Sequence, residues 1–209
     1  MEDTLVHCFE NAETERVCAG SGQYPSEQIF KFCLPANDGA LQWGRTRFTV
    51  VARTGALKSM LALSEHFELH VYTKAAQEFA DPILDWFEGG NELFRSRGYQ
   101  QETPSQNEEN PRCVLDIARL LGLSQMDRVL VLDHEDSCPA DQSANWVPVV
   151  PFRGDKNDSE FMTECYKRIL IKASKLGDIR HGITEEFREL IRNKRSGHVV
   201  SKSLHVCNA

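Results

Sequence analysis

Two short apolar segments of this sequence end in side chains that can contact a ligand. The segment 127–133 has four apolar residues in a row and ends at the carboxylate of Asp133. The segment 68–73 is also apolar and ends at the hydroxyl of Thr73. Ligands of α/β proteins bind at the carboxyl ends of parallel strands. Both residues are therefore candidate site residues. Alternatively, Asp133 only caps a loop, and Thr73 is an ordinary strand-end residue without a role in a site.

A third group of polar residues stands at the amino terminus, where Glu2, Asp3 and Thr4 precede an apolar pair and His7. Two interpretations of the acidic residues remain open. They are either part of the same site or a solvated chain end. The role of Arg53, at the end of another apolar segment, is also undecided. Its side chain either attaches that segment to the site or lies exposed at a strand end.

The elements that must position these residues alternate between strand and helix. An alternating, β-rich pattern over 29–34 and 45–53 predicts a hairpin across 29–53. Helical spacing over 55–67 and 74–90 places helices on both sides of the strand that ends at Thr73. This order is typical of a parallel α/β sheet.

The second half of the chain continues the same pattern. Helices are predicted at 114–123, 158–176 and 184–196, and a short strand at 146–152. The unbroken apolar run before Asp133 predicts a central parallel strand that is buried on both faces. We expect an α/β fold with a Rossmann-like central parallel sheet flanked by helices.

Composition limits the classes of function. The chain has 209 residues, 41% of them hydrophobic, and a net charge of −7, which argues against direct nucleic-acid binding. Seven cysteines show no CxxC spacing, and no 18-residue apolar run or secretory signal is present. We expect reduced thiols, no membrane span, and a nuclear or cytoplasmic location.

These segments, in this order, resemble the haloacid dehalogenase superfamily. They are most similar to its branch of phosphatases acting on the RNA polymerase II C-terminal tail, the NLI-interacting-factor-like domain. The stretch from Arg53 to Phe87 carries the most specific similarity. The resemblance implies a phosphatase-like domain over 1–180, with a hairpin insertion at 29–53 and a polar loop at 100–110. The remaining residues, 181–209, are expected to form a C-terminal helix and tail.

The resemblance implies phosphoryl transfer through an aspartyl-phosphate, assisted by Mg²⁺. The family's first motif is Asp-x-Asp-x-Thr-Leu-Val-His, of which the last four residues match the segment Thr4 to His7. Glu2 stands at the acid/base position, and the position of the nucleophile precedes Met1. The nucleophilic Asp and the apolar strand that carries it are therefore absent from this sequence.

The other family positions are mixed. Thr73 matches the hydroxyl that binds phosphate, and Lys74 is a candidate for the missing cation, or else a solvated lysine. Leu115 stands where the family has a phosphate-binding Lys. Asp133 matches a metal-binding carboxylate, but His134 follows it where the family has Asp or Asn. Mg²⁺ prefers oxygen ligands, so Glu135 and Asp136 are further candidates.

Two functions follow from this pattern. The first is a catalytically impaired pseudophosphatase that binds a phosphorylated protein or peptide, such as the RNA polymerase II tail. The second is an active Mg²⁺-dependent serine/threonine phosphatase whose first strand and nucleophile lie upstream of the sequence shown. Leu115 and His134 lie far from the amino terminus, so they favour the first. A mitochondrial import receptor with the same domain is disfavoured, because no Arg-rich presequence is present.

Overall fold

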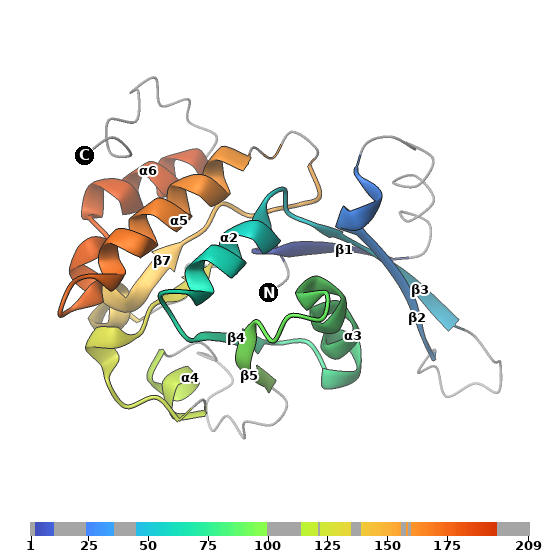
Figure 1. Ribbon diagram of the computed structural model, residues 1–209, viewed down its shortest axis with the longest axis horizontal. Helices are drawn as coiled ribbons and strands as arrows, with labels where there is room; N and C mark the ends of the chain where they lie inside the picture. The colour runs from blue at the N-terminus through green and yellow to red at the C-terminus, as the bar shows by residue number, and fades with distance from the viewer. Residues whose placement is uncertain are drawn as a thin grey trace.

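The computed structural model describes residues 3–10, 24–35, 45–99, 114–120, 122–134, 139–155, 158 and 160–195. The strands are β1 (Val6–Glu10), β2 (Ile29–Pro35), β3 (Arg45–Ala52), β4 (Leu69–Thr73), β5 (Phe94–Tyr99), β6 (Val131–Asp133) and β7 (Trp146–Pro148). The helices are α2 (Ala56–Ser64), α3 (Gln77–Glu88), α4 (Val114–Leu120), α5 (Glu160–Ser174) and α6 (Glu185–Arg195). The mixed α/β class with parallel strands flanked by helices is confirmed (Figure 1).

The first three strands form an antiparallel sheet in the order β1-β3-β2. The predicted hairpin is present as β2 and β3, with Ile29 paired to Val51. The third strand, β1, begins within the Thr-Leu-Val-His stretch, and its first residue, Val6, pairs with Ala52. This sheet projects from the end of the molecule opposite α5 and α6 (Figure 1).

The parallel strands form two separate pairs in the described part of the chain, β4 with β5 and β6 with β7. The prediction of one buried central strand over 127–133 is wrong in two respects. The strand is only Val131–Asp133, because Met126–Arg128 form a 3-10 turn. Its residues are half-buried instead of fully enclosed. An apolar run indicates burial, but it does not indicate how many strands lie beside it.

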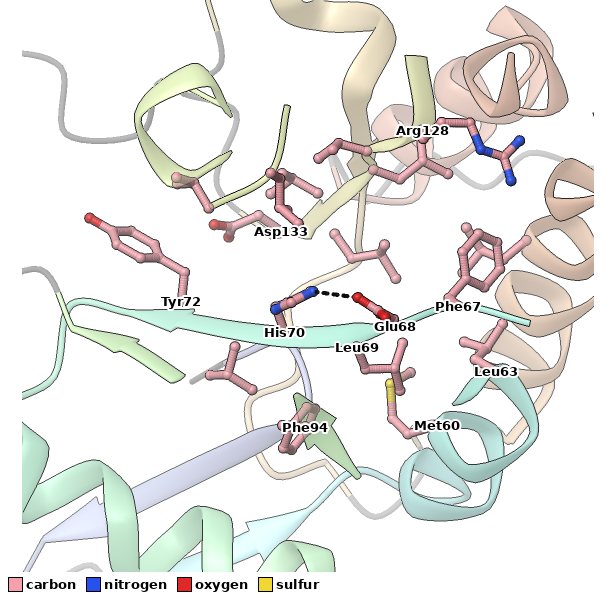
Figure 2. A pocket seen from close by; sticks show the side chains of 18 of the residues that line it. Met60, Leu63, Phe67, Glu68, Leu69, His70, Tyr72, Phe94, Arg128 and Asp133 are labelled. Atoms are coloured by element: carbon pink, nitrogen blue, oxygen red, sulfur yellow. Dashed lines mark ion pairs between the residues drawn. The ribbon is translucent and has the colours of Figure 1, made fainter. Parts of the chain in front are cut away.

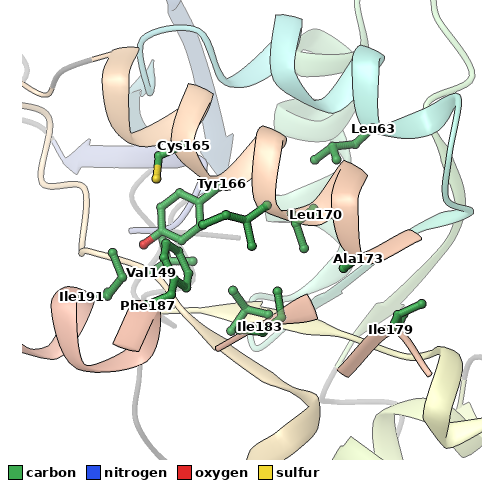
Figure 3. Packing of buried hydrophobic residues seen from close by; sticks show 12 residues of the cluster. Leu63, Val149, Cys165, Tyr166, Leu170, Ala173, Ile179, Ile183, Phe187 and Ile191 are labelled. Atoms are coloured by element: carbon green, nitrogen blue, oxygen red, sulfur yellow. The ribbon is translucent and has the colours of Figure 1, made fainter. Parts of the chain in front are cut away.

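The larger of the hydrophobic clusters joins α5 and α6 to α2 and β7 (Figure 3). Leu63 of α2 and Leu170 of α5 are buried there, and α6 contributes Phe187 and Ile191, both fully enclosed. The Tyr166 ring meets Phe187 edge to face, and its hydroxyl donates to the Pro148 carbonyl over 3.0 Å. This cluster holds β7, and through it β6, in place.

A second cluster holds the antiparallel sheet against α3. Its buried members are Val6, Val50, Ala56, Ile83, Phe87 and Leu93. The Phe30 ring also stacks on Trp86, with centroids 5.4 Å apart. The amino-terminal residues that precede β1 are thereby held close to the parallel strands.

Candidate functional site

Three of the predicted site residues come together at the carboxyl end of β6. The Thr4 hydroxyl lies 3.3 Å from Nδ1 of His134, although 130 positions separate the two residues. The same nitrogen lies 3.3 Å from Oδ1 of Asp133. Thr4 is buried, and the side chains of Asp133 and His134 are 20% and 18% exposed. The structure therefore brings together a hydroxyl, an imidazole and a carboxylate, from the first predicted motif (Thr4) and the last one (Asp133 and His134).

Backbone hydrogen bonds fix the amino-terminal side of this cluster. Asp3 has a positive φ of 55°, and its N–H donates to the Val6 carbonyl over 2.7 Å. The Asp3 carbonyl accepts from the Phe152 N–H, and the Leu5 carbonyl accepts from the Arg53 N–H over 2.8 Å. Thr4 thus sits in a turn that is attached on one side to β3 and on the other to the segment after β7.

Arg53 reinforces the same attachment with its side chain, which is only 2% exposed. Its guanidinium donates to both carboxylate oxygens of Asp158, at 2.8 and 2.9 Å. It also donates to the carbonyls of Val150 and Thr4, at 2.9 and 3.3 Å. The interpretation of Arg53 as an exposed strand end is therefore wrong, and its charge positions the backbone of Thr4.

Thr73 lies at the carboxyl end of β4, as expected, and is 6% exposed. Its hydroxyl oxygen accepts a hydrogen bond from the Ala75 N–H over 3.2 Å, which shapes the turn into α3. Lys74 is exposed in that turn. A role for either in phosphate binding stays a prediction.

Leu115 lies on α4 with 36% of its surface exposed, and its N–H donates to Oε1 of Gln142 over 3.2 Å. A hydrocarbon side chain offers no donor for a phosphate oxygen. Glu2, Glu135 and Asp136 fall outside the described residues. The 100–110 loop and most of the predicted C-terminal tail also fall outside them, and the division at 180 stays a prediction.

The donor set tests whether Mg²⁺ fits this site. Among the described residues, no group of three or more His, Cys, Asp or Glu side chains is placed to hold a metal. Beside Asp133 stands an imidazole nitrogen in place of a second oxygen donor. The Asp3 carboxylate is 2.6 Å from Nδ1 of His7. Because Mg²⁺ prefers oxygen ligands, the described side chains do not fit it by themselves.

A cavity of about 510 Å³ adjoins the cluster, between β4 and β6 (Figure 2). Thr4, Leu5 and Asp133 line it together with residues 67–72 and 128–132. We call this cavity the β4–β6 slot. Sequence reasoning missed it, because the apolar runs before Thr73 and Asp133 indicate burial without showing that the two strands stand apart.

Comparison with models of protein families shows the family to which this chain belongs. The family model described as NLI interacting factor-like phosphatase matches residues 1–180. The chain belongs to this family. A search of curated proteins finds no match.

Two solved structures share the fold of this chain. Fission yeast Fcp1, an RNA polymerase II CTD phosphatase, in a variant bound to beryllium fluoride, matches with a TM-score of 0.56 and 18% identity. That match covers 95% of this chain and 48% of the Fcp1 chain. A second structure, of Fcp1 as an essential RNA polymerase II CTD phosphatase, has a TM-score of 0.57 and 16% identity, covering 96% and 65%. The chain spans about half to two thirds of these relatives, and the likeness shows the fold. None of the described helices is both long and apolar enough to cross a membrane.

Proposed function

We propose that this polypeptide is a phosphatase-family domain that binds a phosphorylated protein and is impaired in hydrolysis. The observation that carries the proposal is the pair of replaced positions inside the fold. His134 supplies a nitrogen that contacts both Thr4 and Asp133, where an oxygen ligand would hold Mg²⁺. Leu115 supplies an exposed hydrocarbon where a cation would hold phosphate. Both changes weaken transition-state stabilisation without removing the fold.

The proposed partner is a phosphorylated serine/threonine peptide of the kind found in the RNA polymerase II tail, and the proposed location is the nucleus. Family membership and the names of the two solved relatives support this choice. The Thr4 and Thr73 hydroxyls and Lys74 are the groups through which we expect the phosphate to bind. A peptide phosphate carries three strong acceptor oxygens, which suit hydroxyl and ammonium donors.

A second candidate is the active Mg²⁺-dependent phosphatase, in which an added apolar strand brings the nucleophilic Asp. The open β4–β6 slot favours it, because Thr4 and Leu5 line the slot and a strand placed there would end beside Thr4. Such a strand would add a carboxylate near Asp133. The replacements at Leu115 and His134 would remain.

The two candidates differ in turnover. We would assay para-nitrophenyl phosphate and a phosphoserine heptad peptide with Mg²⁺, and measure binding of the same peptide by fluorescence anisotropy. The binding function predicts saturable peptide binding and hydrolysis no faster than in an Asp133→Asn variant. Asp141→Asn is the matched control, because Asp141 is exposed on the 3-10 turn before β7. Turnover that disappears in Asp133→Asn and persists in Asp141→Asn would contradict impaired catalysis, and absence of peptide binding would contradict the binding function.

A further inference from the structure

The exposed side of α5 carries a row of cations. Arg168, Lys172 and Lys175 are all exposed, at positions i, i+4 and i+7 of the helix and the turn that ends it. Residues at this spacing lie on one side of a helix. In Figure 1, α5 runs between α2 and α6, and the three cations occupy the side that the packed helices leave exposed. We call these three side chains the α5 basic stripe.

The cations of the stripe have no ion-pair partner among the described residues. Other cations of the fold are paired, since Arg97 contacts three carboxylates and Arg192 on α6 pairs with Glu185. Like charges three or four positions apart on a helix destabilise it. The stripe therefore carries a repulsion that an anion bound along it would relieve.

The acidic side chain at the start of the stripe is already neutralised. Glu164 pairs with Lys167 over 2.5 Å. The pKa of the Glu164 carboxyl is lowered, mainly by this hydrogen bond, and the charges of Lys167, Lys58 and Arg168 outweigh the opposing effect of burial. The surface at the start of α5 is thus electropositive, although the whole chain has a net charge of −7.

The other end of the stripe combines a further cation with an exposed apolar side chain. Leu176 is 41% exposed, just past the end of α5. Arg128 is also exposed, and it donates to the carbonyls of Leu176 and Gly177 at 2.6 and 3.3 Å. The C-terminus of a helix carries partial negative charge. Because Arg128 offsets that charge, it does not cancel the charges of Lys172 and Lys175.

The spacing of the stripe matches an extended chain. Arg168, Lys172 and Leu176 follow at steps of four residues, which is about 6 Å per step along a helix. Alternate side chains of an extended chain point the same way and lie about 6.6 Å apart. A segment of the pattern Glu-x-Glu-x-Leu would place a carboxylate opposite each of the two cations and its leucine opposite Leu176. One cation at each step suits a carboxylate better than a phosphate, whose two charges and three oxygens need several donors.

We propose that the α5 basic stripe, together with Leu176 and Arg128, is a docking surface for an acidic, extended segment of a partner protein, of the pattern Glu-x-Glu-x-Leu. Charge complementarity selects the segment, and the leucine contact sets its register. A membrane surface is disfavoured, because Leu176 alone offers little apolar area for insertion. The interaction uses no phosphate group, so it is separate from the proposed phosphopeptide binding.

The test follows the amide NMR shifts of the whole chain during titration with the peptide Gly-Glu-Ala-Glu-Ala-Leu-Gly at low ionic strength. We expect saturable shifts grouped at residues 168–177, and at least tenfold weaker binding in high salt. The control peptide carries Gln for both Glu and should bind at least tenfold more weakly. Equal binding of the two peptides, or saturable shifts only outside α5 and its final turn, would overturn the proposal.

Charge reversal locates the interaction. Arg168→Glu combined with Lys172→Glu should abolish the shifts. Lys31→Glu combined with Arg95→Glu makes the same change of charge at exposed cations of β2 and β5 and should preserve them. A peptide with Lys for both Glu should bind the Arg168→Glu, Lys172→Glu chain and not the parent. Loss of stability could not produce this rescue, and its failure would contradict pairing along the stripe.

Two further ligands separate the sources of negative charge. A peptide with phosphoserine for both Glu should bind no more than tenfold tighter than the Glu peptide, because each step offers one cation. A larger gain would assign the stripe to phosphate and overturn the carboxylate. The chain should not sediment with vesicles of equal phosphatidylcholine and phosphatidylserine. Sedimentation that Arg168→Glu combined with Lys172→Glu removes would make the partner a membrane, and a protein segment would be wrong.

Discussion

Arg53 and Asp158 form a two-pronged ion pair across 105 positions of sequence, with Nε 2.8 Å from Oδ2 and Nη2 2.9 Å from Oδ1. Their side chains are 2% and 11% exposed. The guanidinium lies 5.8 Å from the centre of the Phe152 ring and also donates to the Thr4 carbonyl. One buried cation thus links the end of β3, the site turn and the segment before α5.

Removing this cation should destabilise the fold. Arg53→Met leaves the Asp158 carboxylate and two carbonyls without their donor, and breaking a buried pair from one side costs about 3 kcal/mol or more. Urea unfolding measures the loss. Arg95→Met, at an exposed arginine on β5, should stay within about 0.5 kcal/mol of the parent. The double variant with Asp158→Asn should cost less than the two single changes summed; simple additivity would refute the coupling.

The loop after Phe152 depends on a glycine. Gly154 has φ +66°, and a Cβ there would meet the Phe9 ring at 2.5 and 2.9 Å. Gly154→Ala should lower the free energy of unfolding by about 2–3 kcal/mol, from the left-handed backbone and the overlap together. Gly122→Ala is matched in φ, at +71°, but has no atom within 4 Å, so it should cost only about 1 kcal/mol. Equal losses in thermal or urea unfolding would show that Phe9 moves aside freely.

Tyr99 should make stability fall at high pH. Burial, the Asp81 hydrogen bond and the Asp81 charge raise its pKa from 10.0 to about 12. The folded state therefore keeps a proton that the unfolded state releases above about pH 10, so this stabilisation is complete below pH 10 and disappears by pH 12. The parent should lose on the order of 2 kcal/mol more than Tyr99→Phe across this window. Parallel curves for the two proteins, from urea unfolding at each pH, would contradict the assignment.

The same network should respond at low pH. Burial alone would raise the pKa of Asp81, but hydrogen bonds from Tyr99, Gln77 and Arg97 outweigh it and lower that pKa below 3.8. Asp81 therefore stabilises the fold above its unfolded pKa, and this contribution disappears as the pH falls through the lowered value. Asp81→Asn should flatten the loss of stability below about pH 4 in acid unfolding. An acid transition as steep as that of the parent would count against it.

Restoring a cation at Leu115 should strengthen phosphate binding. We propose that Leu115 stands at the position of the family's phosphate-binding Lys. Leu115→Lys would then supply an ammonium there, and we expect about tenfold tighter binding of the phosphoserine heptad peptide, with a strong salt dependence. Leu176→Lys is the control, because it adds the same charge at another exposed leucine, after α5. Anisotropy titrations separate the two. Equal gains in affinity for the two variants would indicate general electrostatic attraction. No gain in affinity for Leu115→Lys would show that the phosphate does not bind near this position.

The amino-acid sequence by itself was enough to predict what depends on local pattern. Alternation over 29–34 and 45–53 gave the hairpin, because a period of two places apolar side chains on one face of a sheet. Helical spacing predicted α2 and α3. The sequence also predicted that one strand ends at the hydroxyl residue Thr73 and another at the carboxylate residue Asp133, as β4 and β6 do. The ordered motifs also indicated the family that the comparison confirmed.

Only the tertiary structure decided what depends on groups far apart in the chain. The contact of Thr4 with His134, the burial of Arg53 against Asp158, and the separation of β4 from β6 each join segments that no local pattern relates. An apolar run indicates that its side chains are buried, but it does not indicate which neighbouring strand its backbone pairs with. Which strands hydrogen-bond depends on their neighbours along the sheet, and in the described part of the chain the edges of β4 and β6 both face one apolar slot.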